Sequence, residues 1–324
     1  IYNPKEGVYM GKERKRGKLL EFMALIKEKK NHTFDVISSS IDEVKDSRYL
    51  ITLDADTIMP RDTAKSLIGA MSHILNRPCM ENGKVIHGYT IMQPKVSISL
   101  ESKNSTLFSK IFAGEGGVDG YSTAYSDVYE DLFAEGIFTG KGIIEIDTFY
   151  EILHDKIKDN TVLSHDLLEG ELTRCALVTD AELIDNYPSS YESSCKRLHR
   201  WVRGDWQLVS WIFSRNLSLL SKWKVLDNLR RSLVAPALLL AVFLNIIMLS
   251  GTNQILILCF LGIITPLIFT VTDFVVTPKN KMRGSFKSFR QIIFIISFIP
   301  YQAYLMSDAI IRTLFRLLVS KKHL

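Results

Sequence analysis

The chain has 324 residues, with 40 Lys and Arg against 35 Asp and Glu, which gives a formal net charge of +5. This length has room for one sizeable domain and an appendage, and we expect no nucleic-acid partner. The four cysteines contain no Cys-x-x-Cys pair, so the sequence indicates neither a zinc site nor a disulfide framework. The chain begins at Ile1 without a signal peptide, and we expect it to be a piece of a longer product.

The part of the chain up to Trp223 has the composition of a soluble domain, whereas only Asp273 and Asp308 supply acidic groups after Arg231. Strands are predicted at Phe34–Ser38, Tyr49–Leu53, Thr90–Ile98, Gly136–Ile144 and Ala176–Ile184. Helices are predicted at Arg16–Glu28, Asp62–Leu75, Leu100–Phe112, Asp127–Phe133 and Asp166–Thr173. Strands that alternate with helices predict an α/β layer structure. Because this sheet is short of strands at its N-terminal side, we expect further strands upstream.

Two carboxylates, Asp54 and Asp56, follow the apolar strand that begins at Tyr49. In an open α/β sheet, ligands bind at the carboxyl ends of the strands. An Asp-x-Asp pair there suits a hard divalent cation that also binds substrate phosphates. The alternative is a pair of solvated aspartates, and the motifs farther along the chain favour the metal site.

The segment from Ala113 to Tyr121 contains four glycines, which disfavour a stable helix or strand. We therefore predict a mobile loop, and its position between a helix and the segment beginning at Glu135 favours a lid that closes over a site.

Asp166 directly precedes an apolar helical run, in the sequence Ser-His-Asp-Leu-Leu-Glu-Gly. One interpretation is an ordinary N-cap aspartate, which is the commonest reason for this placement. The functional interpretation is a general base that removes a proton from a sugar hydroxyl. Together with the strand-end pair, Asp166 resembles a base that faces a metal site.

A third motif, Arg197 to Gln207, is rich in arginine and tryptophan. Its cationic side chains can converge on a diphosphate, whose oxygens suit arginine. Trp201 and Trp206 offer flat faces on which a sugar ring can stack. A basic, aromatic helix at a membrane interface explains the same residues, and both interpretations can hold together.

The C-terminal third is predicted to be a membrane region. The runs 233–249 and 255–272 are nearly uncharged and close to the length of a spanning helix. Basic residues flank this pair on both sides, which predicts that the flanks and the globular domain are cytoplasmic. The run 292–306 contains Pro300, and whether it spans, re-enters or lies in the interface stays open. We thus expect boundaries after residues 215 and 232, with a basic interfacial segment at 216–232.

The order Asp-x-Asp, base aspartate and Arg-x-x-Arg-Trp resembles that of processive, membrane-anchored glycosyltransferases such as cellulose and hyaluronan synthases. Their third motif usually begins with glutamine, where this chain has Arg197, and their base motif reads Thr-Glu-Asp. These departures, and the segments at 3–11, 13–19, 136–142 and 199–207, more closely resemble the glucosyltransferase domain of cyclic β-1,2-glucan synthases. Members of that family are much longer and carry additional membrane helices and a glycoside-phosphorylase-like region.

The resemblance implies a nucleotide-sugar transferase fold of the GT-A type and a role for each motif. Asp166 is the implied catalytic base, and Asp54 and Asp56 are the implied ligands of Mg²⁺ or Mn²⁺, with Asp56 the more direct one. The implied contacts to the donor UDP-glucose are Lys15, Gly17, Asp54, Arg197, Arg200 and Arg203. The implied contacts to the glucan acceptor are Glu135, Gly140, Gly142, Trp201 and Trp206. The usual uracil-binding aspartate is expected upstream of this chain.

The resemblance also implies the reaction: an inverting, metal-dependent transfer of glucose to a growing β-1,2-glucan. The implied location is the inner membrane, multi-pass, with the transferase domain in the cytoplasm and with further domains of a longer synthase on either side. A phenol oxygen of Tyr121 or Tyr125 as first acceptor is an additional hypothesis. The alternatives are a processive synthase of another β-linked polysaccharide and a non-catalytic export or regulatory membrane module.

Overall fold

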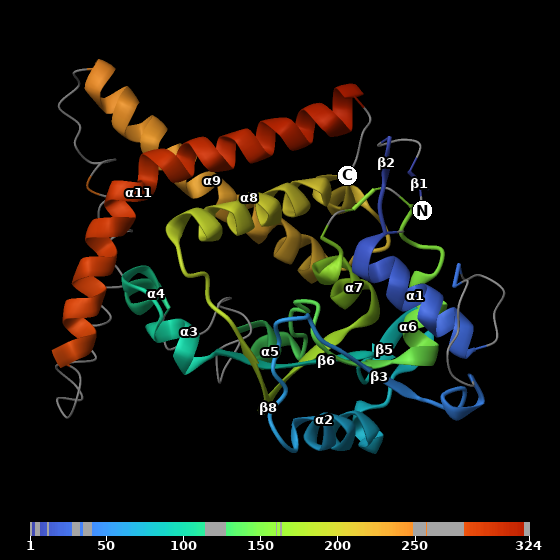
Figure 1. Cartoon of the computed structure of the whole chain (residues 1–324). Coiled ribbons are helices and arrows are strands. Elements are labelled where there is room, and N and C mark those ends of the chain that lie inside the picture. Colours follow the sequence, from blue (N-terminus) through green and yellow to red (C-terminus); the bar gives the residue numbers. More distant parts are fainter. Residues whose placement is uncertain are drawn as a thin grey trace.

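A central sheet with helices on both faces, and two long helices that extend from one end of it, make up the fold (Figure 1). The structure is a computed structural model. It describes residues 2–3, 7–11, 13–27, 33–34, 41–113, 128–159, 161–162, 164–248, 257 and 282–320, with the backbone alone for 282–289.

The sheet contains four strands in the order β3, β7, β6, β8. Their bounds are Tyr49–Thr52 for β3, Gly142–Glu145 for β7, Ile91–Ile98 for β6 and Cys175–Asp185 for β8. Strand β7 is antiparallel to both of its neighbours, whereas β6 and β8 are parallel. Consequently β3, β6 and β8 run in one direction and β7 runs in the other. Thr52 pairs with Gly142, so the chain enters β7 beside the carboxyl end of β3.

Ten helices and two small hairpins accompany the sheet in the described part of the chain. The helices are α1 (Arg14–Ile26), α2 (Thr63–Ser72), α3 (Leu100–Asn104), α4 (Leu107–Phe112), α5 (Val128–Phe133), α6 (Ile146–Leu153), α7 (Asp166–Thr173), α8 (Tyr191–Gln207), α9 (Leu219–Met248) and α11 (Met282–Phe315). The hairpins pair β1 (Tyr2–Asn3) with β2 (Val8–Tyr9) and β4 (Cys79–Glu81) with β5 (Lys84–His87). Short 3₁₀ turns lie at Ile41–Glu43, Ile74–Asn76 and Val209–Phe213, and a π-helical turn at Arg316–Ser320 follows α11.

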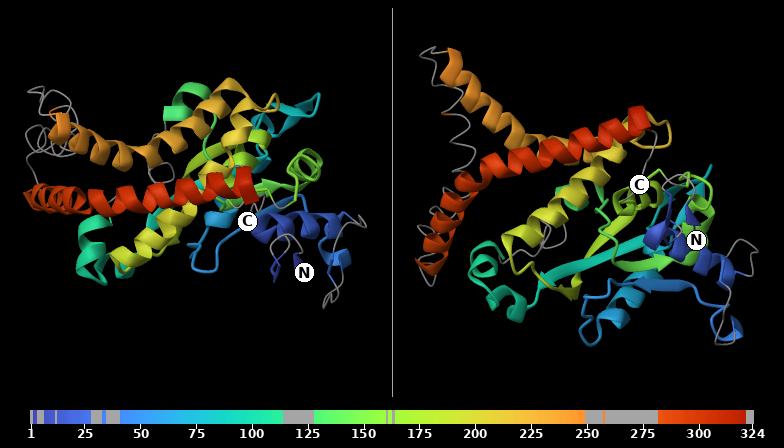
Figure 2. Two further views of the ribbon diagram at one scale, coloured as in Figure 1. Left: turned by 90° about the horizontal axis from the view of Figure 1, so that it is seen from above. Right: turned by 45° about the horizontal axis from the view of Figure 1, so that its top comes forward.

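Apolar residues on the two faces of the sheet form two hydrophobic clusters. Ile144 packs with Met23, Phe149 and Leu168 from α1, α6 and α7, whereas its neighbour Ile143 packs on the other side with α2. Successive side chains of a strand point to opposite faces, which explains this division. The expected α/β layer structure is therefore confirmed (Figure 2).

Most predicted elements are confirmed within a few residues, and three differ. Only the end of the predicted strand 136–144 is a strand, because β7 begins at Gly142. The predicted helix 100–112 is two helices, because the side chain of Thr106 caps a new helix by accepting a hydrogen bond from the backbone N–H of Ser109. The predicted helix 62–75 ends at Ser72, before a 3₁₀ turn. Most of the predicted strand 34–38 and the glycine-rich loop lie outside the described residues.

Helices α9 and α11 have the length and apolar character of membrane spans, over Leu219–Ile247 and Arg290–Ser320. In the most apolar stretch of each helix, 11% and 22% of the residues are buried, which is unlike the core helix of a soluble domain. The predicted run 233–249 falls in α9 apart from its last residue. The run 292–306 is part of a longer continuous helix than expected, and 255–272 lies outside the described residues.

The predicted domain boundaries stay predictions, since α9 runs without interruption from the expected interfacial segment into the first expected span. Helix α11 packs against both α9 and α8 (Figure 2).

A buried lysine fastens α9 to the sheet domain. The ammonium group of Lys224 lies 2.9 Å from Oε1 of Glu171 and donates to the backbone oxygen of Gly136 at 3.2 Å. Both charged side chains are buried, and burial raises the pKa of Glu171 although Lys224 opposes this. The pair therefore ties the first turns of α9 to α7 and to the segment that leads toward β7.

We predict that Lys224→Met destabilises the fold by about 3–5 kcal/mol at neutral pH, because it leaves Glu171 buried without its partner. Urea unfolding measures this. The deficit should shrink at acid pH, where Glu171 takes up a proton. Lys196→Met removes the exposed ion pair with Glu192 and should leave the stability nearly unchanged. Equal losses in the two variants would contradict the structural role of Lys224.

Candidate active site

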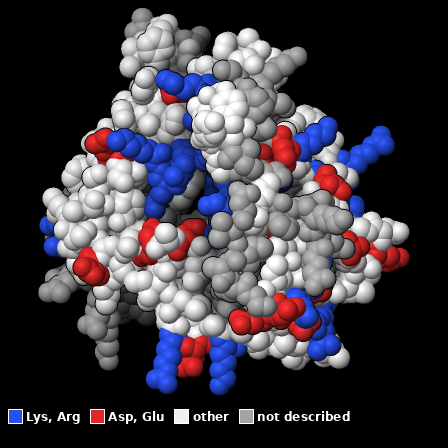
Figure 3. All heavy atoms as spheres, turned by 45° about the vertical axis from the view of Figure 1, so that its right-hand side comes forward, with Lys and Arg blue, Asp and Glu red and all other residues white. Residues whose placement is uncertain are grey.

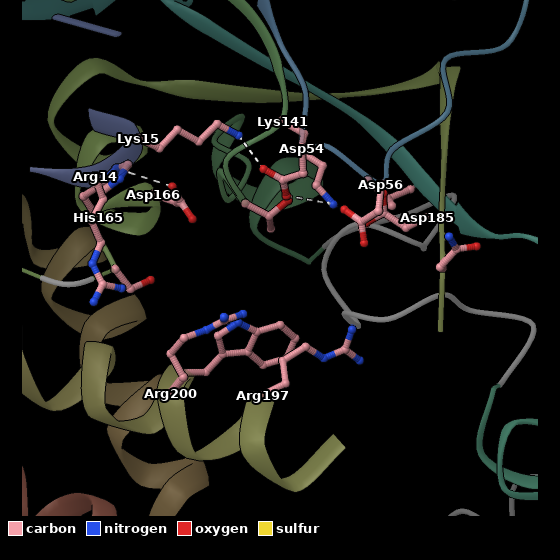
Figure 4. Close-up of a pocket in the computed structure, with 15 residues that line it drawn as sticks. Arg14, Lys15, Asp54, Asp56, Lys141, His165, Asp166, Asp185, Arg197 and Arg200 are labelled. Carbon is pink, nitrogen blue, oxygen red and sulfur yellow. Dashed lines mark hydrogen bonds and ion pairs between the residues drawn. The ribbon is translucent and has the colours of Figure 1, made fainter. Parts of the chain in front are cut away.

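A cavity of about 460 Å³ lies between the sheet and α8, where the loops after β3 and β8 meet the segment before β7. Its lining residues are Arg14, Lys15, Asp54, Asp56, Val96, Thr139, Lys141, Ser164, His165, Asp166, Asp185, Asn186, Arg197, Arg200 and Trp201. Arg197 and Arg200 on α8 face the carboxylates across the cavity (Figure 4). A space-filling view shows a hollow bordered by basic side chains, with acidic side chains below it (Figure 3).

The loop after β3 carries Asp54 and Asp56 and is held at the end of β8. Ile58 pairs with Ile184 in an isolated bridge, and the hydroxyl of Thr57 donates to the carboxylate of Asp185 at 2.7 Å. This anchoring fixes the loop across the carboxyl ends of two strands, which is where ligands bind in sheets of this kind.

Two lysines neutralise Asp54. Its carboxylate lies 2.7 Å from the ammonium group of Lys15 and 3.3 Å from that of Lys141. Partial burial raises the pKa of Asp54, but the two lysines outweigh it and hold the pKa below its usual value. Lys141 also contacts the carboxylate of Asp185 and so bridges the ends of β3 and β8.

The first turn of α1 supplies Arg14 and Lys15. Lys15 also donates to the backbone oxygen of Gly140 at 2.6 Å. Glu13 and Arg14 have φ angles of 46° and 56°, in the left-handed region that such residues seldom occupy. Burial and the nearby charge of Arg200 lower the pKa of Arg14. Strained backbone of this kind is concentrated at functional sites.

Helix α8 presents Arg197, Arg200 and Trp201 from one face, as expected from a spacing of three and four residues. The guanidinium carbon of Arg197 lies 5.0 Å from the ring centroid of Trp201, so the arginine is oriented by an aromatic face. Farther along the helix, Gly204 permits a close approach, because a Cβ there would lie 2.5 Å from the Cβ of Ser164. The glycine thereby brings α8 against the segment that carries Asp166.

Asp166 is the first residue of α7, and its side chain is 33% exposed. His165 occupies the N-cap position, so the alternative interpretation of Asp166 as the N-cap residue is wrong. Gly140, with a φ angle of 90°, lies against the Asp166 carboxylate, since a Cβ would be 3.0 Å from both oxygens. The aspartate therefore faces the cavity with glycine backbone beside it.

A second cavity of about 390 Å³ adjoins the first and extends between α7, α8, α9 and α11. Four residues line both cavities: Thr139, Ser164, Asp166 and Trp201. Most of the other side chains in the second cavity are apolar, among them Phe138, Leu198, Val202 and Met306. Asp166 and Trp201 thus stand at the junction of a polar, highly charged cavity and a largely apolar one.

The structure brings seven of the predicted site residues into the first cavity: Lys15, Asp54, Asp56, Asp166, Arg197, Arg200 and Trp201. Gly140 lies behind Asp166. The remaining ones, Gly17, Arg203, Glu135, Gly142 and Trp206, are not among the described residues that line either cavity.

The positions of these remaining residues are nonetheless defined. Gly17 is buried in α1, and Gly142 begins β7, where a Cβ would lie 2.3 Å from the backbone oxygen of Met92. The Glu135 carboxylate lies 3.8 Å from Lys224, and the Trp206 indole donates to Ser232 at 2.8 Å. Partial burial, together with the charges of Arg316, Arg14 and Arg312, lowers the pKa of Arg203.

The sequence interpretation did not assign roles to Arg14, Lys141, His165 or Asp185, which all line the cavity. Asp185 ends β8, so the strand-end argument that selected Asp54 also selects it. Lys141 stands between two glycines, which is a visible signal, but its partners come from distant strands and only the fold shows them.

The carboxylates suit a hard divalent cation. Asp54 is engaged by two lysines, whereas no ion pair to Asp56 is found among the described residues. Mg²⁺ is usually held by one or two carboxylates with water and substrate phosphates. Asp56 therefore fits the more direct ligand, with Asp54 beside it.

The chain is related to a polysaccharide synthase along nearly its whole length. The relative is the cyclic beta-(1,2)-glucan synthase NdvB of Rhizobium meliloti (strain 1021), with 39% identity over 99% of this chain and 12% of the relative. The resemblance to this synthase is thereby confirmed, and the chain corresponds to a small part of a much longer protein. No protein-family model matches the chain.

Proposed function

We propose that the chain transfers glucose from UDP-glucose to a growing β-1,2-glucan, as a GT-A-type glycosyltransferase. One observation carries the proposal: a single cavity gathers the strand-end carboxylates, Asp166 and the arginines of α8 from distant parts of the sequence. The relation to a cyclic β-1,2-glucan synthase supports the choice of polymer and linkage.

The donor diphosphate would lie between α1 and α8. Arg14 and Lys15 approach the cavity from one side, and Arg197 and Arg200 approach it from the other. Guanidinium groups bind phosphate oxygens in a bidentate manner, and preorganised cations stabilise the charge that develops on a leaving group. Clustered arginines, which repel one another without a ligand, are therefore well suited to a diphosphate.

Asp56, with Asp54, would hold Mg²⁺ or Mn²⁺. Such an ion would neutralise charge on the leaving diphosphate. Asp54 would also keep Lys15 directed into the donor side through the contact described above.

Asp166 would act as the base. It removes the proton from the acceptor 2-hydroxyl, the hydroxyl oxygen bonds to C1 of glucose, and the bond from C1 to UDP breaks with its electron pair leaving on the diphosphate. Asp166 as the base, with Asp54 and Asp185 engaged by lysines and Asp56 assigned to the metal, favours inversion, from an α-donor to a β-product. Glycosidases differ, because two carboxyl groups flank their scissile bond.

The acceptor would approach through the second cavity. Trp201 stands at the junction and offers a flat face to a sugar ring, while α9 lines the path beyond it with the polar side chains of Asn228, Arg231 and Ser232. With these helices in a bilayer, the polymer end would meet Asp166 beside the membrane. We infer a multi-pass protein of the inner membrane with a cytoplasmic transferase domain, joined to further domains of a longer synthase.

The deciding experiment incubates the membrane-reconstituted protein with radiolabelled UDP-glucose and Mg²⁺ and analyses the linkage of the product. We expect β-1,2-linked glucose. Another linkage or sugar would identify a different β-glycan synthase, and complete absence of transfer would favour a non-catalytic membrane module.

The metal assignment predicts that Asp56→Asn abolishes transfer with the fold retained, because the amide keeps the shape and loses the charge that a hard cation needs. Turnover at saturating Mg²⁺ and circular dichroism measure the two effects. Asp62→Asn is the matched control, since Asp62 has a φ angle of 67° that asparagine tolerates and lies away from the cavity. Undiminished turnover in the Asp56 variant would end the assignment.

The base assignment predicts that Asp166→Asn lowers the chemical step by about 10²–10⁴-fold and leaves UDP-glucose binding nearly intact. Single-turnover kinetics and calorimetric titration separate these quantities. Collapse of binding would instead make Asp166 a structural residue, and the base would have to be sought elsewhere, first at Glu135.

Gly140 provides a test of how closely Asp166 must be placed. Gly140→Ala should lower kcat by about 10²-fold, because the new Cβ pushes the carboxylate aside. Gly83→Ala is matched, since Gly83 also has a positive φ but open space where a Cβ would be. Both variants should lose stability by similar amounts, so equal kcat values would show that the position of Asp166 is unaffected.

A further inference from the structure

We propose that His165 and Glu169 are positioning residues for Asp166: the buried pair holds the carboxylate of the base by one oxygen and leaves the other for the acceptor hydroxyl. This inference rests on the proposed function, since it gives the pair a role in the same transfer. Neither residue was assigned a role from the sequence.

The hydrogen bonds of His165 define its tautomer. The backbone N–H of Arg16 donates to Nε2 at 3.2 Å, so Nε2 is an acceptor and the ring proton is on Nδ1. Nδ1 lies 2.9 Å from Oε1 of Glu169 and 3.4 Å from Oδ1 of Asp166. Nδ1 therefore lies between two carboxylates, that of the buried Glu169 and that of Asp166 at the edge of the cavity, and Figure 4 shows the contact between His165 and Asp166.

Glu169 is 0% exposed and belongs to the same helix as Asp166. Among the described residues, Nδ1 of His165 is the ion-pair contact of Oε1, and neither carboxylate oxygen of Glu169 has an aligned hydrogen bond. Burial raises the pKa of Glu169, and the neighbouring imidazole opposes this. A buried carboxylate with so few partners costs stability that an apolar residue would not. Stability alone therefore gives no reason for an acid at this position.

The contact of Nδ1 with Oδ1 restricts how the Asp166 side chain rotates, while the glycine backbone at residue 140 lies against the same carboxylate. Oδ2 is then the oxygen that takes the acceptor proton. The ring proton stays on Nδ1 throughout, so His165 orients the base without exchanging a proton with the substrate.

The same imidazole links the base to the donor side. Arg16, whose N–H holds Nε2, follows Lys15, which contacts Asp54. The Arg16 guanidinium is itself fixed, because it pairs with Glu13 at 2.7 Å and donates to the backbone oxygen of Ile157 at 3.1 Å. The first turn of α1 thus fixes the positions of both His165 and Lys15.

Two substitutions of His165 separate positioning from a merely structural role. The amide of His165→Asn comes near the place of Nδ1 and keeps a donor toward Asp166, whereas that of His165→Gln comes near the place of Nε2 and keeps an acceptor for Arg16. We expect Asn to retain most of the wild-type kcat and Gln to lose about 10²-fold, with similar KM for UDP-glucose. If Gln is the better replacement, the Arg16 contact is what matters and the proposal is overturned.

Glu169→Gln tests the role of the second residue of the pair, and Glu192→Gln, at an exposed position, is the control. We expect kcat to fall by about 10-fold or more for Glu169→Gln, with donor KM and calorimetric UDP-glucose binding unchanged. An unchanged kcat, or a loss that appears only in KM, overturns the proposal.

Failure of the proposed function has a different signature, because wild-type protein would then transfer no glucose and the positioning role would fall with it. When wild-type protein is active and Asp166→Asn is not, a reversed order of the Asn and Gln variants removes the positioning role alone.

Discussion

Electrostatic repulsion among carboxylates is the constraint on which the site depends. Asp54, Asp56 and Asp185 converge where the ends of β3 and β8 meet, and like charges so close would separate the two loops without compensation. Lys141 provides that compensation by contacting both Asp54 and Asp185. It reaches this place only because β7 runs against its neighbours, so that the residues before β7 lie at the ends of the others.

The local sequence pattern was sufficient to predict those helices and strands whose signals lie within a few residues of one another. The apolar run at 49–52 became β3, and the helix expected to begin at Asp166 begins there. A strand was correctly expected near 142–145, but its beginning was placed too early, since residues 136–141 belong to no strand. Pairing partners, which decide where a strand begins, lie far away in the sequence. The division of helix 100–112 has a local cause instead, because the hydroxyl of Thr106 offers the backbone a cap.

The candidate site could be predicted in part for the same reason. Asp54, Asp166 and Arg200 follow from motifs, and the fold brings them into one cavity. Trp206 and Glu135 belong to segments whose other residues line the cavity, but their own side chains point away from it. The Trp206 indole contacts Ser232, and the Glu135 carboxylate contacts Lys224. The contribution of His165 depends on a backbone amide 149 positions earlier, which no local pattern contains. Tyr121 and Tyr125 lie outside the described residues, and the priming hypothesis stays a prediction.

The buried ammonium of Lys224 has a mechanical consequence. It joins the start of α9 to the backbone oxygen of Gly136, four residues before the glycine that touches Asp166. With α9 embedded in lipid, no slack chain would separate the bilayer from the reaction centre. A tilt of that helix, forced by a thicker or thinner bilayer, would pull directly on the wall of the cavity. The rate of catalysis would then depend on bilayer thickness, and hence on lipid composition, through this direct connection between α9 and the cavity wall.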